Sequence, residues 1–223
     1  MLREARAAIW DMDGVLLESA DVHYRSWVEV LEDYGLTMAR QDFERTFGMN
    51  NRNLLRRIYG ERLSEEQVAE IGSRKEARYR ELIRGHAQAL PGTREWLERL
   101  SRQGWRQAIA WSAPMANVAA ILNELGLWPQ VDAVLSGGRL PLSKPDPAIF
   151  LQAAAALGVP PARCVVIEDG TVGVEAARLA GMRSIAVTTT HPAEELSAAD
   201  LIVDRMDRLP PDAFDRLVPE GGG

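Results

Sequence analysis

The sequence holds a single cysteine, Cys164, among its 223 residues, and this scarcity excludes an intramolecular disulfide. Cys164 opens the apolar run 164–167, where a small buried thiol is the expected role. The chain also lacks any apolar run that approaches the ~20 residues of a transmembrane helix. The first residues show no signal-peptide pattern, so we expect a cytoplasmic protein that binds no membrane.

Positive charge is also in short supply. Lys and Arg number 26 against 32 Asp and Glu, which gives a formal net charge of -6 at pH 7. A nucleic-acid backbone binds basic surfaces, and the arginines here are spread along the chain, so we expect no nucleic-acid partner. The hydrophobic fraction of 46% and the charged fraction of 26% are typical of a globular protein. The oligomeric state stays open between a monomer and a small homo-oligomer.

One short stretch carries the strongest local signal. The apolar residues 7–10 run directly into Asp11-Met12-Asp13-Gly14. A short apolar run that ends in a turn signal is typical of a buried strand, and open α/β sheets bind ligands at the carboxyl ends of their strands. Two carboxylates this close repel each other unless a cation lies between them, and oxygen ligands suit Mg²⁺. The alternative is that both acids merely shape a turn or cap a helix.

Beyond residue 90 the pattern alternates between helices and strands. We expect helices at 93–103, 115–125, 147–157 and 172–180, and strands at 105–111, 131–135, 164–167, 184–187 and 201–203. Strands that alternate with helices of about ten residues predict a parallel sheet covered on both faces. The predicted fold class is therefore α/β, with a Rossmann-like, doubly wound sheet that also takes in the strand at 7–11.

The segment between these two parts shows no strand pattern and carries apolar residues at helical spacing. We expect helices at 21–34, 41–47, 53–59 and 64–84, the last opened by a capping box from Ser64 to Gln67. Because this block follows the first strand, it should form a cap that closes a site against water. The predicted domains are an α/β core of residues 1–15 and 89–223, and an inserted all-helical cap of residues 16–88.

Three further polar loops follow strands and should emerge at the same sheet edge as the first two acids. Ser112, at a helix start, offers a hydroxyl and an amide to a phosphate group, or it only caps the helix. Lys144, directly before a proline, serves as a point charge for phosphate, or it is a solvated surface lysine. Glu168 and Asp169 would complete an acidic metal site, whereas in isolation Asp169 would cap the next helix.

The chain resembles the haloacid dehalogenase-like superfamily. The resemblance rests on four motifs in this order, one after each of four strands: Asp11-Met12-Asp13-Gly14, Ser112, Lys144-Pro145 and Glu168-Asp169. It covers nearly the whole chain, and the helical insertion matches the subgroup that includes β-phosphoglucomutases and many sugar-phosphate phosphatases. One departure is Gly170, where the family often has Ser, which affects the fine tuning of a metal site and leaves the site itself in place.

This resemblance implies a role for each motif. Asp11 would attack phosphorus and carry an aspartyl-phosphate, while Asp13 would act first as the general acid and then as the base. Mg²⁺ would bind an Asp11 oxygen, the Asp13 backbone carbonyl and Asp169, with Glu168 as a further or water-mediated ligand. The phosphoryl oxygens would be held by Ser112, Ala113 and Lys144. Dehalogenases and phosphonatases lack the second acid, so the resemblance points to phosphate esters.

The cap decides between a phosphatase and a mutase. Candidate cap contacts are His23, Gly48, Arg52 and Lys75, although His23 and Lys75 are also compatible with packed or solvated helix positions. In β-phosphoglucomutases a Lys precedes this Gly, whereas this chain has Phe47. A mutase must hold a bisphosphorylated intermediate in two orientations, which favours fixed cations in the cap. We therefore expect Mg²⁺-dependent hydrolysis of a small phosphomonoester, foremost a sugar phosphate; a β-phosphoglucomutase-type phosphotransferase is the alternative, and an inactive binding module ranks third.

Three further side chains receive structural roles from the sequence alone. His86 and His191 have no partner in the pattern, so we assign both a structural role. Trp111 ends an apolar strand, where a core position is the more common fate of a large aromatic residue. The alternative for Trp111 is a place in the wall of the pocket.

Overall fold

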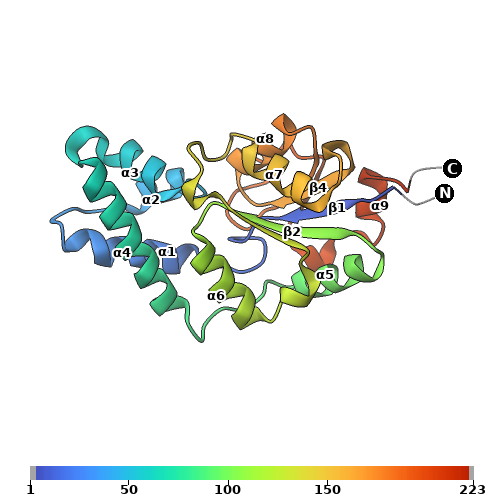
Figure 1. Cartoon of the computed structure of the whole chain (residues 1–223), viewed down its shortest axis with the longest axis horizontal. Helices are drawn as coiled ribbons and strands as arrows, with labels where there is room; N and C mark the ends of the chain where they lie inside the picture. The colour runs from blue at the N-terminus through green and yellow to red at the C-terminus, as the bar shows by residue number, and fades with distance from the viewer. Residues whose placement is uncertain (1–3, 221–223) are drawn as a thin grey trace.

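The computed structural model describes residues 4–220, and a parallel sheet forms its centre (Figure 1). The strands follow the order β3-β2-β1-β4-β5-β6, with every neighbouring pair parallel. They are β1 (Ala7–Trp10), β2 (Arg106–Trp111), β3 (Ala133–Ser136), β4 (Cys164–Glu168), β5 (Arg183–Val187) and β6 (Leu201–Val203). The predicted doubly wound α/β class is confirmed, with the first strand between β2 and β4.

Helices cover both faces of this sheet. They are α5 (Thr93–Arg102), α6 (Met115–Leu125), α7 (Ala148–Leu157), α8 (Thr171–Leu179) and α9 (Ala213–Leu217). Side chains of β1 alternate between the two resulting cores: Ala8 and Trp10 pack with α5, α6 and α9, while Ala7 and Ile9 pack with α7 and α8. A strand buried on both faces needs apolar residues at every position, which explains the continuous run at 7–10. Cys164 is fully buried, and burial raises the pKa of its thiol to about 12.

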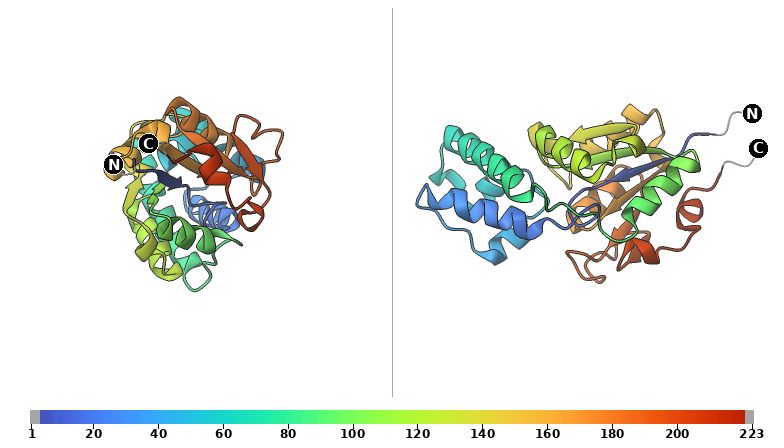
Figure 2. Two further views of the ribbon diagram at one scale, coloured as in Figure 1. Left: turned by 90° about the vertical axis from the view of Figure 1, so that its right-hand side faces the viewer. Right: turned by 90° about the horizontal axis from the view of Figure 1, so that it is seen from below.

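Four helices between the first and second strands pack on one another at one end of the molecule (Figures 1 and 2). They are α1 (Ala20–Glu32), α2 (Arg40–Thr46), α3 (Asn51–Tyr59) and α4 (Glu65–Ile83). Their apolar faces form a separate cluster around Trp27, Phe43 and Leu55. The chain termini lie at the opposite end of the molecule. The exact domain bounds stay a prediction.

Local side chains explain where some helices begin. The capping box of α4 is present, with Gln67 N 3.1 Å from Ser64 Oγ and Ser64 N 2.9 Å from Gln67 Oε1. Helix α3 begins two residues earlier than expected because Asn50 caps it, its Oδ1 accepting from Asn53 N at 2.9 Å. Short 3-10 turns complete the fold at Gly60–Arg62, Trp128–Gln130, Gly137–Arg139, Pro161–Arg163 and Met206–Arg208. In the described part of the chain, every helix is too short or too polar to cross a membrane.

Candidate active site

A pocket of about 740 Å³ opens at the carboxyl edge of the sheet, with walls from both the sheet and the helical cap. The register aligns Trp10 of β1 with Ile109 of β2 and with Ile167 of β4, so the loops after these three strands emerge side by side. The predicted residues Asp11, Asp13, Ser112, Lys144, Glu168 and Asp169 all line this pocket. Their roles stay a prediction, but the parallel sheet brings all six to one cavity.

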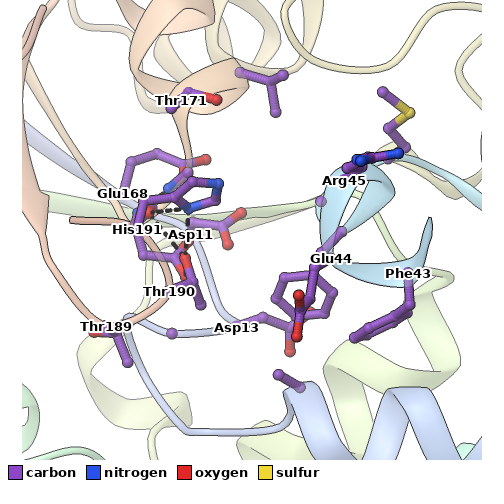
Figure 3. A pocket seen from close by; sticks show the side chains of 18 of the residues that line it. Asp11, Asp13, Phe43, Glu44, Arg45, Glu168, Thr171, Thr189, Thr190 and His191 are labelled. Carbon is purple, nitrogen blue, oxygen red and sulfur yellow. Dashed lines mark hydrogen bonds between the residues drawn. The ribbon is translucent and has the colours of Figure 1, made fainter. Parts of the chain in front are cut away.

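Three buried carboxylates gather on the floor of the pocket, from Asp11, Glu168 and Asp169. Figure 3 shows two of them, Asp11 and Glu168. Each of the three offers an oxygen, and these oxygens all lie within 4.8 Å of one another. Burial, together with the charge of Glu168, raises the pKa of Asp11 to about 8, although Lys144 partly offsets the shift. Burial and the charges of Glu168 and Asp11 also raise the pKa of Asp169 well above its ordinary value. Three carboxylates are therefore more than this site can hold in charged form by itself.

Lys144 supplies a cation to this acidic cluster. Its Nζ donates to Asp11 Oδ1 and lies 2.5 Å from Glu168 Oε1. Burial alone would lower the pKa of Lys144, but the charges of Asp11 and Glu168 raise it above its ordinary value. Lys144 is therefore a buried ion-pair partner of the acidic cluster, and the alternative of a solvated surface lysine is wrong.

Two glycines let the backbone approach these carboxylates. Gly14 has φ +70°, and a Cβ there would lie 1.8 Å from Asp169 Oδ2. At the start of α8, a Cβ on Gly173 would lie 2.0 Å from Glu168 Oε1. Asp169 does not cap α8: Gly170 is the N-cap residue, and no side chain makes a capping bond there. The Asp169 carboxylate points into the site instead.

The donor set fits a hard divalent cation such as Mg²⁺. All three groups are oxygen ligands, which Mg²⁺ and Ca²⁺ prefer. Their mutual repulsion, seen in the raised pKa of Asp11 and of Asp169, is the kind that a bound dication relieves. Asp11, Glu168 and Asp169 would hold the ion.

Asp13 is held as a carboxylate by three side chains. Ser19 Oγ donates to its Oδ1, Trp111 Nε1 donates to its Oδ2 at 2.7 Å, and His23 Nε2 lies 3.3 Å from Oδ2. Burial alone would raise the pKa of Asp13, but His23 and the hydrogen bonds from Ser19 and Trp111 hold it below its ordinary value. Trp111 belongs to the buried core, as expected, and also lines the pocket, so the structure shows both of the predicted positions.

His23 and Lys75 lie behind the pocket rather than in its lining. Lys75 is buried, with Nζ 2.7 Å from His23 Nδ1 and 3.0 Å from Glu76 Oε1. An ammonium group only donates, so Nδ1 accepts and Nε2 carries the proton that faces Asp13. Glu76 also accepts from Asn117 of α6, which ties α4 to the core. Lys75 thus supports Asp13 through His23 and makes no contact with the cavity.

The cap wall presents different cations from those expected. Gly48 lines the pocket, but Arg52 is exposed outside it and pairs with Glu65 at 3.0 Å. Arg52 is turned outward because it lies near the start of α3, where Glu65 of the next helix attracts it. Arg45 and Arg57 do line the cavity, and neither has a carboxylate partner among the described residues.

The phosphate-binding loop predicted after β2 is tightly packed. Ser112 lines the pocket, whereas Ala113 lies behind the lining, its carbonyl accepting from Ser136 Oγ at 2.7 Å. Gly138 passes so close behind that a Cβ there would lie 2.9 Å from Pro114 N. The structure therefore places the Ser112 side chain at the cavity and the Ala113 side chain away from it.

The loop after β5 contributes residues that sequence reasoning missed. Thr190 Oγ1 donates to Asp169 Oδ2 at 2.7 Å, and His191 Nδ1 lies 3.1 Å from the Asp169 backbone oxygen (Figure 3). Both residues line the pocket, so the expectation of a purely structural role for His191 missed its place at the cavity. A signal was present: the polar run Thr188–His191 follows an apolar strand, as the other site loops do.

The family is settled by comparison with known sequences. A family profile described as haloacid dehalogenase-like hydrolase matches residues 5–181. The chain belongs to this family. Hexitol phosphatase B of Escherichia coli (strain K12) is 33% identical over 187 residues, which cover 83% of this chain and 84% of that protein.

Two further members lie on the mutase side of the family. β-Phosphoglucomutase of Bacillus subtilis (strain 168) is 32% identical over 211 residues, which cover 92% of this chain and 91% of that protein. The crystal structure of β-phosphoglucomutase from Clostridium difficile superposes with a TM-score of 0.87 at 28% identity, over 96% of each chain. This haloacid dehalogenase-like hydrolase is therefore an enzyme for phosphate esters, with phosphomutase chemistry as the alternative to hydrolysis.

Proposed function

We propose that the protein is a Mg²⁺-dependent phosphatase that hydrolyses a small phosphomonoester, foremost a sugar or polyol phosphate, through an aspartyl-phosphate on Asp11. The observation that carries this proposal is the environment of Asp11. Its carboxylate lies on the pocket floor, with one oxygen bound by Lys144 and with two more acids close by. Among the described residues its second oxygen has no hydrogen-bond donor, which leaves it available to an electrophile.

The first chemical step transfers the phosphoryl group to the protein. The anionic phosphate ester raises the pKa of Asp13 as it binds, so Asp13 takes up a proton in the complex. An Asp11 oxygen then attacks phosphorus, the ester P–O bond breaks, and Asp13 delivers this proton to the departing alcohol oxygen. Ser112 and Lys144 bind the phosphoryl oxygens during this transfer. A bound Mg²⁺ supplies charge neutralisation for the transferred group.

The second step releases phosphate. Asp13, now a carboxylate, takes a proton from water as the water oxygen attacks phosphorus and the bond to Asp11 breaks. The products are inorganic phosphate and the free Asp11 carboxylate. The depressed pKa of Asp13 in the resting site suits this base role, and the contacts from Ser19, Trp111 and His23 hold the carboxylate ready.

The cavity supports a small, hydroxylated substrate. A volume of about 740 Å³ is in the range of small-molecule sites. Beyond the acidic floor, polar side chains such as Glu44, Arg45 and Thr189 share the lining with Phe43 and Phe47. Hexitol phosphatase B, a relative of similar length and sequence, is named for its action on hexitol phosphates.

A specific observation favours the mutase alternative. Arg45 and Arg57 stand without carboxylate partners on the cap side of the cavity, among the described residues. A sugar bisphosphate needs a second cationic site at a distance from Asp11, and two free guanidinium groups suit a phosphate. They would supply the charge that is missing at Phe47.

The test is phosphate release with Mg²⁺ from a panel of sugar, polyol and aryl phosphates, with EDTA as the metal-free arm. We expect release from one or a few esters, abolished by EDTA and by Asp11→Asn. Asp212→Asn, a change at an exposed surface acid, is the matched control and should leave release unchanged. Conversion of β-glucose 1-phosphate to glucose 6-phosphate with a trace of glucose 1,6-bisphosphate, without net release, would establish the mutase. No turnover of any ester would favour the binding module.

A further inference from the structure

The loop after β5 is the fifth strand-end loop that lines the pocket, after those that follow β1, β2, β3 and β4. Thr188 N donates to Val203 O at 2.9 Å, which fixes the start of the loop on β6. Thr189, Thr190, His191 and Pro192 then line the cavity in sequence. Because Pro192 restricts the backbone of the residue before it to extended conformations, His191 is held at this rim with little freedom.

The hydrogen bonds of His191 define which ring nitrogen carries a proton. Nδ1 lies 3.1 Å from the Asp169 backbone oxygen and 2.9 Å from Thr190 Oγ1. A carbonyl oxygen only accepts, and the Thr190 hydroxyl already donates to Asp169. Both contacts therefore need a proton on Nδ1. In the neutral ring Nε2 is then a hydrogen-bond acceptor.

The remaining edge of the ring faces the cavity. Figure 3 shows the His191 ring anchored on one side by its dashed contacts, with the other side toward the open pocket. The anchor is the backbone of Asp169, whose carboxylate lies within 4.8 Å of that of Asp11. Among the described residues Nε2 has no partner. It does not belong to the metal cluster, since the atoms within 4.8 Å of one another come from Asp11, Glu168 and Asp169. His191 thus offers a fixed acceptor in the pocket that also holds Asp11.

We infer that His191 determines specificity: its Nε2 accepts a hydrogen bond from a hydroxyl group of the substrate's alcohol part, close to the phosphate ester. This inference rests on the proposed function, and it narrows the substrate to hydroxylated phosphate esters. The phosphoryl group itself is bound elsewhere, at Ser112 and Lys144. Loss of the His191 acceptor therefore weakens recognition of the alcohol part and leaves phosphoryl binding intact.

Two substitutions separate the anchor from the acceptor. In His191→Asn the amide nitrogen replaces the anchored Nδ1, but nothing reaches the position of Nε2. In His191→Gln the longer side chain places an amide oxygen near the Nε2 position. The matched control is His86→Asn, at an exposed histidine that does not line the pocket.

The experiment measures kcat/KM for sorbitol 6-phosphate, glucose 6-phosphate and p-nitrophenyl phosphate, and the inhibition constant of inorganic phosphate. For the hydroxylated esters we expect His191→Asn to lower kcat/KM about tenfold, mainly through KM, with part of the loss regained in His191→Gln. Turnover of p-nitrophenyl phosphate and inhibition by phosphate should stay within about twofold of the unmodified enzyme. Calorimetry on Asp11→Asn should show the same selectivity without turnover. Adding His191→Asn should weaken the affinity for sorbitol 6-phosphate and leave the affinity for methyl phosphate unchanged.

Three results would overturn the inference, each in a recognisable way. Wild-type activity in His191→Asn would show that the ring is only an anchor. An equal loss for all esters and for phosphate inhibition would show that it acts on the phosphoryl site or on the loop as a whole. If the unmodified enzyme neither turns over nor binds any ester, the proposed function fails and this inference falls with it.

Discussion

Without a bound metal ion, the protein's stability should fall as pH rises through neutrality. The reason is the Asp11 carboxyl group, whose pKa is raised from 3.8 to about 8 by burial and by the acids around it. Between these two values the folded state binds a proton that the unfolded state has released. The free energy of unfolding therefore decreases with increasing pH in this window.

The size of the effect follows from the width of the window. An interval from 3.8 to about 8 spans roughly four pH units, and each unit corresponds to ~1.4 kcal/mol. The metal-free protein should therefore lose on the order of 5 kcal/mol of stability from Asp11 between the two limits. A bound Mg²⁺ removes the dependence because it stabilises the charged carboxylates.

The assay is urea denaturation at pH 5 and pH 8, in EDTA and in excess Mg²⁺. In EDTA we expect a lower free energy of unfolding at pH 8 than at pH 5, and in Mg²⁺ a much smaller difference. Asp11→Asn is the control: because an amide does not titrate, it should make the EDTA profile shallower, and Asp169, whose pKa is also raised, accounts for the dependence that remains. Equal stability at both pH values in EDTA, or a profile that Asp11→Asn leaves unchanged, would refute the reasoning.

Two further predictions concern the residues around Asp13. Trp111→Phe keeps the aromatic ring but removes the N–H that donates to Asp13, so the pKa of Asp13 rises and the carboxylate that acts as base in phosphate release is less available. Because that step is common to all esters, kcat should fall about tenfold for alkyl phosphates and for p-nitrophenyl phosphate alike, and a loss confined to alkyl phosphates would contradict this role. Lys75→Met leaves the Glu76 carboxylate buried without its cation and should cost about 3–5 kcal/mol in urea denaturation. The matched change Arg52→Ala removes an exposed ion pair and should cost less than about 1 kcal/mol; similar losses for the two variants would count against the buried network.

The sheet, and the gathering of polar residues at the carboxyl ends of its strands, could be predicted from the sequence because both follow from short-range rules. The apolar run at 7–10 indicates a strand buried on both faces, and parallel strands must present their carboxyl ends together. Asp11, Ser112 and Asp169 therefore reach one cavity regardless of the details of the helices. Gly14 could be predicted only in part: its turn was evident, but the close approach of Asp169 was not.

Side-chain directions in the cap were beyond sequence reasoning. Lys75 and Arg52 are both cations on helices, yet one is buried against His23 while the other pairs with Glu65 in solvent. The difference depends on how α3 and α4 pack, which no local pattern specifies. The pocket position of Trp111 was only the second choice, and that of His191 was missed, for a related reason: each makes a long-range contact, with Asp13 or with Asp169, and neither pair is close in sequence.

The central claim is that Asp11 accepts the phosphoryl group, and the most direct measurement is to trap it there. The enzyme would be mixed with Mg²⁺ and its best substrate from the panel, quenched in acid within the first turnover, and digested for mass spectrometry. The account predicts one added phosphoryl group on the peptide that contains Asp11, absent from Asp11→Asn. Rapid phosphate release with no label on this peptide, or undiminished release by Asp11→Asn, would contradict it.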